Sequence, residues 1–115
     1  MAERVSPRRI IEHVLRRYTV EYDEMVSRSR APQVVRCRDA VVYALRETAG
    51  MSYPEIARAM GRTGHTAMMQ MYQRACRWPE TERRLLIASV ERIGSDRLER
   101  VEQRDRFMAT VGGAA

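Results

Sequence analysis

Residues 52–78, SYPEIARAMGRTGHTAMMQMYQRACRW, contain two short amphipathic helical patterns separated by glycines. Ser52, with Glu55 three residues later, forms a capping box that marks the start of a helix. Two glycines then interrupt the helical pattern, and Pro79 prevents the second segment from continuing as a helix. The spacing therefore predicts two helices joined by a tight turn, which is the arrangement of a helix-turn-helix.

The second helix of this pair, beginning at His65, has one apolar and one polar side. The apolar side carries Met68, Met71, Tyr72 and Ala75. The polar side carries His65, Thr66, Met69, Gln70, Gln73, Arg74 and Arg77. A solvated helical hairpin has the same pattern, so two interpretations stay open from these residues: a plain hairpin, or a helix that presents side chains to a DNA groove.

The positive charge of the chain is concentrated in the same region. Residues 28–78 hold nine Arg against three acidic residues, whereas residues 1–27 and 79–115 each have equal numbers of basic and acidic residues, so the net charge of +6 comes from the middle segment. All 21 basic residues are Arg, whose planar fork of donors binds phosphate and guanine in a bidentate manner. A basic segment that coincides with a helix-turn-helix favours the DNA-binding interpretation.

Length and composition are typical of one small globular domain. The chain has 115 residues, with 44% hydrophobic and 31% charged residues, which is enough to bury one core. No apolar run approaches the roughly 18 to 20 residues needed to span a bilayer, and no signal segment opens the chain. We therefore expect a cytoplasmic protein that does not bind membranes.

The sequence contains no pattern of residues that is typical of catalysis or of cofactor binding. No GxxxxGK[ST] loop is present, so we expect no nucleotide site, and no nucleophile elbow or paired carboxylates occur. Cys37 and Cys76 lack CxxC spacing; buried free thiols are the favoured interpretation, with a disulfide or metal site as the alternative. We expect no enzyme activity, no cofactor and no bound metal.

The fold class predicted from hydrophobic periodicity is all-α: a small helical domain with a helix-turn-helix, plus one or two appended C-terminal helices. Three helices are expected before the pair described above: one starting at Ser6-Pro7 with Tyr18 among its inward residues, one over 20–26, and one from Pro32 or Gln33 to Thr48. In the second of these, Tyr22, Met25 and Val26 are expected to face inward.

Residues 79–115 are predicted to form an appendage to a domain comprising residues 1–78, which is expected to fold by itself. Residues 80–93 are amphipathic, Gly94-Ser95 interrupt the pattern, and Asp96 begins a further helix. The apolar positions are Leu86, Val90, Ile93, Leu98, Val101 and Met108. Two interpretations stay open: solvated surface helices, or an interaction surface over residues 80–108 for a second copy or a replication or transcription protein. The terminal VGGAA is expected to be frayed.

Several of these features together resemble the C-terminal DNA-binding domain of the bacterial replication initiator DnaA. They are the basic loop Ser27-Arg28-Ser29-Arg30, the helix beginning near Pro32 with Arg36 and Arg38, Ser52-Tyr53-Pro54-Glu55-Ile56, and Gly61 followed by His65-Thr66. The similarity extends without gaps from about Ser6 to Trp78. It implies a basic loop in the minor groove and a helix-turn-helix in the major groove of a DnaA box. The family usually has Gly-Arg-Asp-His-Thr-Thr where this chain has Arg62-Thr63-Gly64-His65-Thr66-Ala67.

The residues and the resemblance together give a set of candidate DNA-binding positions. Arg30 matches the family Arg that enters the minor groove, and His65 and Thr66 lie where side chains meet bases or phosphates. Arg62 is a candidate base or phosphate ligand in place of the displaced family Arg. Arg36, Arg38, Arg46 and Arg74 are expected to bind phosphates. Tyr53, Pro54 and Met69 are expected to contact thymine methyl groups, and Arg28, Thr63 and Gln70 complete the set.

The function expected from this resemblance is sequence-specific binding of double-stranded DNA. The protein would act as a regulator of transcription or replication at sites similar to the DnaA box. The alternative is a protein-interaction module, or a phage or mobile-element recognition module, that keeps the fold and contacts replication or packaging machinery.

Overall fold

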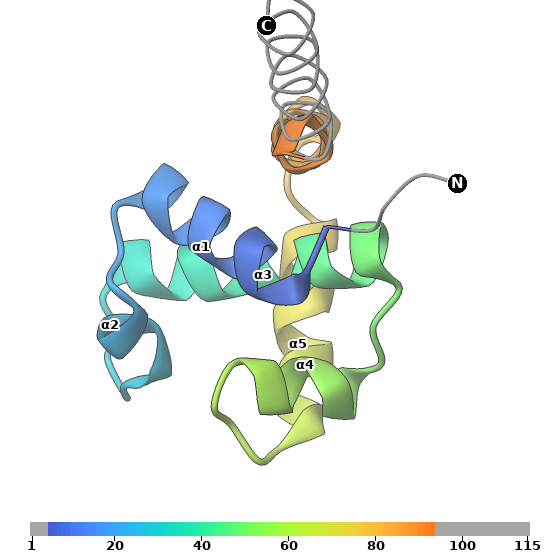
Figure 1. The fold of residues 1–115 in the computed structure, drawn as a ribbon. Coiled ribbons are helices and arrows are strands. Elements are labelled where there is room, and N and C mark those ends of the chain that lie inside the picture. The colour runs from blue at the N-terminus through green and yellow to red at the C-terminus, as the bar shows by residue number, and fades with distance from the viewer. Residues whose placement is uncertain (1–4, 94–115) are drawn as a thin grey trace, which may run out of the picture.

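The computed structural model describes residues 5–93, which form helices and connecting loops with no strand (Figure 1). The labelled helices are α1 (Pro7–Tyr18), α2 (Tyr22–Val26), α3 (Pro32–Ala49), α4 (Tyr53–Ala59) and α5 (His65–Cys76). A further helix follows over residues 80–93. The predicted all-α class with a helix-turn-helix is confirmed; α1, α4 and α5 begin where the sequence predicts, and α3 ends one residue after the predicted Thr48.

Helix α3 is the centre of the fold and packs against each of the other four labelled helices (Figure 1). Every residue from 37 to 45 is buried, which covers the whole circumference of the helix over two turns. A helix that is buried all round must be surrounded by its neighbours. It therefore provides the fixed support on which α4 and α5 are placed.

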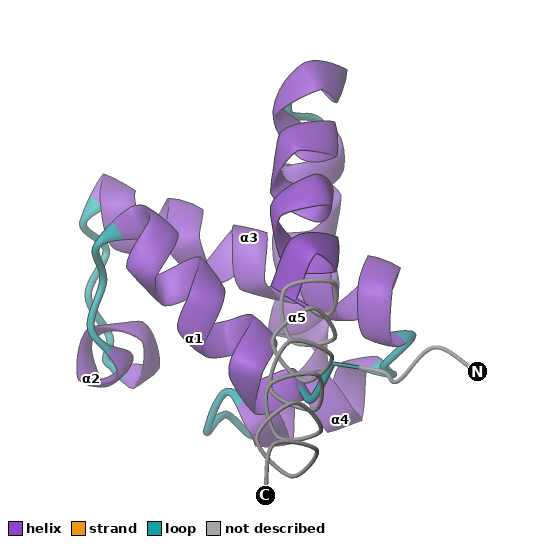
Figure 2. Cartoon of the chain, turned by 45° about the horizontal axis from the view of Figure 1, so that its top comes forward, coloured by secondary structure: helices purple, strands orange, loops and turns teal. Residues whose placement is uncertain are grey.

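Short loops connect the helices, and specific residues fix where each helix begins and ends (Figure 2). Ser6 accepts a hydrogen bond from the backbone N–H of Arg9 at 3.3 Å and so begins α1, with Pro7 in the first turn. Thr19 ends α1 with a φ of 55°, and Gly50 ends α3 with a φ of 61°. Both residues adopt the left-handed conformation that commonly terminates a helix.

Helix α2 differs from the prediction at its start and in its orientation. It begins at Tyr22 because Glu21 and Glu24 form a reciprocal capping box, while Val20 is buried just outside the helix. Met25 is buried, as expected. The expectation that Tyr22 faces inward is wrong, since 48% of this residue is exposed.

The helix over residues 80–93 packs into the core. Leu86 and Val90 are each 1% exposed and belong to the same buried cluster as the residues of α3. On α1, His13 Nε2 lies 3.1 Å from Ser89 Oγ. Leu86 and Val90 of this apolar stripe are therefore unavailable to a partner, and the domain boundary after residue 78 stays a prediction. The expected helix after Asp96 and the frayed tail lie outside the described residues.

Candidate nucleic-acid interface

The turn between α4 and α5 is built by local sequence signals. Ser52 Oγ accepts the N–H of Glu55 at 3.3 Å, and Glu55 Oε1 accepts the N–H of Ser52 at 3.2 Å. The Ser52 hydroxyl also donates to Glu55 Oε1 at 2.7 Å, and this hydrogen bond, followed by that from the Ser52 N–H, lowers the pKa of Glu55. Gly61 has a φ of 69°, and a Cβ atom there would lie 3.4 Å from Val26 Cγ1. The left-handed conformation therefore favours glycine, while a Cβ would only meet Val26 at ordinary contact distance; the predicted capping box and turn are confirmed.

Helix α5 buries one side and leaves the other free. Met68, Met71 and Ala75 face the core, as the periodicity predicts. The outward residues His65, Thr66, Met69, Gln70 and Gln73 are exposed, and Thr63 and Gly64 are exposed just before the helix. An exposed first turn with small and polar side chains matches the requirements of a helix that enters the major groove.

The loop between α2 and α3 presents two arginines to solvent. Arg28 and Arg30 are exposed, and neither has a hydrogen-bond or ion-pair partner among residues 5–93. Hydroxyl groups shape the backbone between them: Ser27 Oγ accepts the N–H of Ser29 at 3.1 Å, and Ser29 Oγ accepts the N–H of Ala31 at 3.3 Å. This loop and the α4–α5 turn both lie at the lower end of the molecule in Figure 1.

Arg38 supports this loop from inside the protein. It is 6% exposed, and its guanidinium donates to the carbonyl oxygens of Met25 at 2.8 Å, Ser29 at 2.6 Å, Glu24 at 3.1 Å and Ser27 at 2.7 Å. Four of its five N–H donors are therefore occupied by backbone. The expectation that Arg38 binds phosphate is wrong, because the carbonyl oxygens around the end of α2 hold its guanidinium inside the fold.

Arg62 reaches the same loop from the α4–α5 turn. Its Nη2 atom donates to the carbonyl oxygens of Met25 at 3.1 Å and Ser27 at 3.0 Å. Its Nε atom is buried without a partner among the described residues. Arg62 is thus held against protein backbone in this structure, and its expected role as a base or phosphate ligand stays a prediction.

Two expected phosphate ligands are engaged with other side chains. The Cζ atom of Arg36 lies 3.9 Å from the centre of the Trp78 ring, and its guanidinium donates a hydrogen bond to Glu82. Arg74 donates two hydrogen bonds to Asp39, at 3.0 and 2.8 Å. Their side chains stay partly exposed, but their guanidinium groups connect α3 to α5 and to the last described helix.

Arg46 also has protein partners. Its Cζ atom lies 4.2 Å from the centre of the Tyr53 ring, and its Nη1 atom donates to the carbonyl oxygen of Met51 at 3.1 Å. The Tyr53 ring meets the Tyr72 ring edge to face, with centroids 6.2 Å apart. Tyr53 is therefore half-buried in a packed cluster, while Pro54 beside it is exposed.

Sequence reasoning missed the residues that hold these arginines. Asp39 and Arg74 are 35 residues apart, and no periodic pattern connects them. One signal was available: Asp39 is one of three acidic residues in the basic segment and interrupts the apolar run of α3. Trp78, which is 8% exposed and stacks with Arg36, carries no comparable signal in the sequence.

The two cysteines are free, with different surroundings. Cys37 is buried and Cys76 is exposed, so the expectation of buried thiols is right for Cys37 and wrong for Cys76. Burial raises the pKa of the Cys37 thiol to about 12. Within residues 5–93, no cluster of three or more His, Cys, Asp or Glu residues could hold a metal ion. In the same part of the chain, none of the helices combines the length and apolarity required to cross a membrane.

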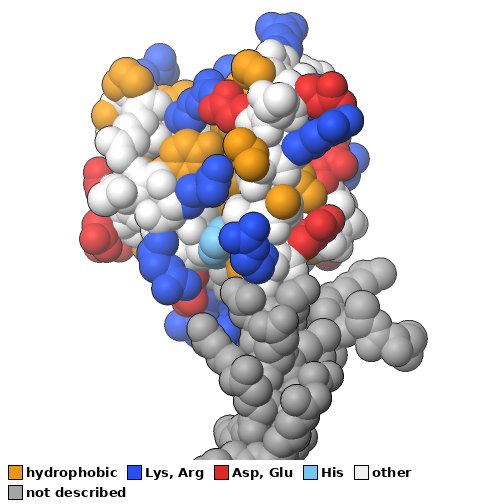
Figure 3. Space-filling view, turned by 90° about the horizontal axis from the view of Figure 1, so that it is seen from above, with side chains coloured by type: hydrophobic (Ala, Val, Ile, Leu, Met, Phe, Trp, Pro, Cys, Tyr) orange, Lys and Arg blue, Asp and Glu red, His pale blue; other side chains and the backbone are white. Residues whose placement is uncertain are grey.

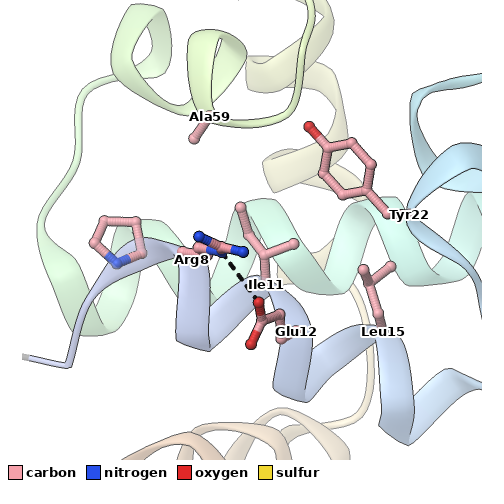
Figure 4. Close-up of a pocket in the computed structure, with 7 residues that line it drawn as sticks. Arg8, Ile11, Glu12, Leu15, Tyr22 and Ala59 are labelled. Atoms are coloured by element: carbon pink, nitrogen blue, oxygen red, sulfur yellow. Dashed lines mark hydrogen bonds and ion pairs between the residues drawn. The ribbon is translucent and has the colours of Figure 1, made fainter.

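An apolar groove of about 660 Å³ lies beside α1, α2 and α4 (Figure 4). Ile11 and Leu15 of α1 line it, together with Tyr22 and Ala59. At its edge, the ion pair Arg8–Glu12 has a separation of 3.2 Å and both side chains are largely exposed.

Comparison with known proteins assigns the motif. Residues 7–75 match the family model described as the bacterial dnaA protein helix-turn-helix. Three similar proteins are chromosomal replication initiator proteins DnaA. That of Corynebacterium jeikeium (strain K411) is 31% identical over 70 residues. Those of Mycoplasma genitalium (strain ATCC 33530) and Mycoplasma pneumoniae (strain ATCC 29342) are 30% and 32% identical, each over 77 residues.

The aligned regions cover 61% of this chain for the first relative and 67% for the other two. They cover only 12% of the first relative and 17% of the others, so this chain spans a small part of each. The family match includes the basic loop, α4 and most of α5, which are the elements that form the exposed surface described above. The chain belongs to the helix-turn-helix family of bacterial DnaA proteins.

Proposed function

We propose that this protein binds double-stranded DNA in a sequence-specific manner. The first turns of α5 occupy the major groove, and the loop bearing Arg28 and Arg30 enters the adjacent minor groove. The observation that carries this proposal is the placement of two exposed surfaces, the α2–α3 loop and the start of α5, at the same end of the molecule (Figure 1). Their connection through Arg62 keeps them together.

The chemistry of the two surfaces fits the two grooves. Arg28 and Arg30 have no partner among residues 5–93 and can enter a narrow minor groove, where the negative potential is enhanced. At the start of α5, Thr66 and Gln70 offer donors and acceptors to base edges, and Met69 offers an apolar surface to thymine methyl groups. His65 adds a donor near the phosphates.

The opposite face of the molecule has a different character. Figure 3 shows that face with acidic and basic side chains interspersed around apolar patches. The helix over residues 80–93 carries the exposed ion pair Arg84–Glu80, separated by 2.6 Å. A face of mixed charge has little net attraction for a polyanion, which supports binding through the end that carries the exposed Arg28 and Arg30.

The proposed role is regulation of replication or transcription at sites that resemble the DnaA box. This activity is binding rather than catalysis and takes place on the nucleoid in the cytoplasm. Because Gly64 and Ala67 stand where the family has Asp and Thr, the preferred sequence should differ from the family's usual site at the bases facing these positions.

The decisive experiment measures affinity for duplexes selected from a random library and for an unrelated duplex across a range of salt concentrations. If two to four arginines neutralise phosphates, log affinity should fall with log salt with a slope of roughly −2 to −4. Thr66→Ala should cost about 1–3 kcal/mol on the selected site and much less on the unrelated one.

Arg92→Ala is the matched control, because Arg92 is exposed in the helix over residues 80–93, away from the proposed surface. It should leave the selectivity between the two duplexes unchanged. Absence of binding at low salt would overturn the proposal. Protein binding would then be the remaining function, with the groove of Figure 4 as the available surface.

A further inference from the structure

The proposed function does not explain why the Arg62 side chain contacts the backbone of a different loop. It leaves the α4–α5 turn, and its Nη2 atom donates to the carbonyl oxygens of both Met25 and Ser27 in another loop. A free arginine in an exposed turn gains full hydration and mobility in solvent. Here the side chain is half-buried and gives up that freedom for two backbone contacts.

The accepting oxygens have a structural reason to attract guanidinium groups. They lie at the end of α2, where backbone carbonyls have no partner within the helix. Arg38 donates to the same two oxygens, through Nε to Met25 at 2.8 Å and through Nη2 to Ser27 at 2.7 Å. A carbonyl oxygen has two lone pairs, so both acceptors are fully used by the two arginines.

These two arginines attach the loop to different parts of the molecule. Arg38 belongs to α3 and fixes the loop to the core. Arg62 belongs to the α4–α5 turn and fixes the loop to the helix-turn-helix, where Gly61 also lies close to Val26. If Arg62 were absent, the loop would keep its attachment to α3 but lose both hydrogen bonds to the turn.

We propose that Arg62 is a positioning residue that holds the Arg28–Arg30 loop at a fixed place relative to α5. The two surfaces then meet DNA as one preorganised unit. The DNA part of this inference rests on the function proposed above. In the family motif a glycine precedes the Arg-Asp-His-Thr-Thr run, and glycine has no side chain to form such a contact, so this is a property of the present chain.

Preorganisation predicts a specific energetic pattern. The loop is already ordered in the folded protein. The free-energy cost of ordering it therefore does not reduce the affinity for DNA. Loss of the Arg62 contact should weaken DNA binding only indirectly, because Arg28 and Arg30 are then less well placed. Arg62 and Arg30 should therefore show strong coupling in a double-mutant cycle although they act at different places.

The first test uses the free protein and needs no DNA. Amide hydrogen exchange over residues 26–31 is compared in the wild type, Arg62→Gln and the control Arg58→Gln, which removes the same charge from an exposed residue of α4 that has no partner among the described residues. Arg62→Gln should raise exchange in this loop by about tenfold, because two charge-assisted hydrogen bonds are lost. Arg58→Gln should leave it unchanged. Unchanged exchange in Arg62→Gln would overturn the proposal.

The second test measures affinity for the selected duplex in a cycle of Arg62→Gln and Arg30→Ala. Arg62→Gln should weaken binding by about tenfold in the wild-type background and clearly less when Arg30 is already absent, because only the contact of Arg28 then remains to be lost. If the fold-losses of affinity in the two single variants multiply in the double variant, Arg62 acts on DNA independently of the loop, and the inference fails. If the wild type binds no DNA, the proposed function fails, while hydrogen exchange still decides whether Arg62 holds the loop.

A conservative variant separates positioning from folding. Lys in place of Arg62 keeps the positive charge and can reach the same carbonyls, so Arg62→Lys should restore most of the protection seen in the wild type. Circular dichroism at the assay temperature establishes that each variant is folded. If Arg62→Gln is unfolded, Arg62→Met, which keeps the aliphatic part of the side chain without its donors, takes its place in the cycle, and its loss of affinity must again be smaller in the Arg30→Ala background.

Discussion

Arg74 of α5 forms a two-pronged ion pair with Asp39 of α3: Nε lies 3.0 Å from Oδ2 and Nη2 lies 2.8 Å from Oδ1. Asp39 is 4% exposed, whereas about half of the Arg74 side chain is exposed. The buried carboxylate thus has its charge balanced by a group that approaches from the surface. The contact joins the central helix to the helix that carries the proposed base-contacting residues.

Loss of the arginine should therefore leave a buried charge without its partner. We expect Arg74→Leu to lower the free energy of unfolding by about 2–4 kcal/mol, measured by urea denaturation. Arg77→Leu, which removes an exposed arginine at the end of the same helix, should change stability by no more than about 0.5 kcal/mol. Equal, small effects for the two variants would show that the ion pair is not needed for folding.

Arg38 and Arg28 should separate stability from binding. Arg38→Met removes four hydrogen bonds to buried or partly buried carbonyls and should destabilise the protein by about 2–4 kcal/mol. Arg28→Met removes an exposed side chain and should leave stability unchanged while it weakens DNA binding. Thermal melting measures the stability of each variant, and the affinity for DNA is measured on the same samples. A stable Arg38→Met variant would contradict the structural role assigned to Arg38.

Adjacent leucines test whether the last described helix belongs to the core. Leu86 is 1% exposed and Leu85 is 62% exposed. Leu86→Ala should cost about 2–4 kcal/mol of unfolding free energy, because it leaves a cavity, and Leu85→Ala should cost less than about 0.5 kcal/mol. Chemical denaturation of the full chain measures both. Similar costs would mean that this helix does not pack as described.

His13 should make stability depend on pH. Ser89 gives its only hydroxyl hydrogen to the carbonyl of Leu86 at 2.7 Å, so His13 Nε2 donates to Ser89. Burial, and then the nearby Arg16 and Arg17, lower the pKa of His13 below its ordinary value of 6.5.

The unfolded state consequently binds this proton more readily than the folded state. Stability should fall as the pH drops from above 6.5 through the lowered pKa of the folded state. Melting temperatures at pH 7.5 and 5.5 measure the effect, and His13→Gln should reduce the difference between them. A pH dependence that is identical in His13→Gln would place its origin elsewhere.

Local signals in the sequence were sufficient for the helices and the turn. The Ser52–Glu55 capping box, the glycine of the turn and the apolar period of α5 act within a few residues, and the physical interactions that they specify are equally short in range. The end of α2 was also predicted correctly, but its start was not, because a pair of glutamates formed the cap.

Only the tertiary structure decided which arginines are exposed and which are bound by other protein groups. Arg28 and Arg38 are both arginines of the basic segment, yet Arg28 is exposed and Arg38 is buried under the backbone of its loop. Nothing in local periodicity distinguishes them, since the acceptors of Arg38 are carbonyl oxygens that every residue type provides. Pairing between Arg74 and Asp39 likewise depends on how α3 and α5 cross.

The sequence by itself determined an all-helical protein with a helix-turn-helix, a basic middle segment and membership of the DnaA helix-turn-helix family. The tertiary structure decided which arginines remain exposed and added residues 80–93 to the core. The physical reason is range: caps and periodicity act between neighbours in the chain, whereas burial and charge pairing depend on groups brought together from distant positions.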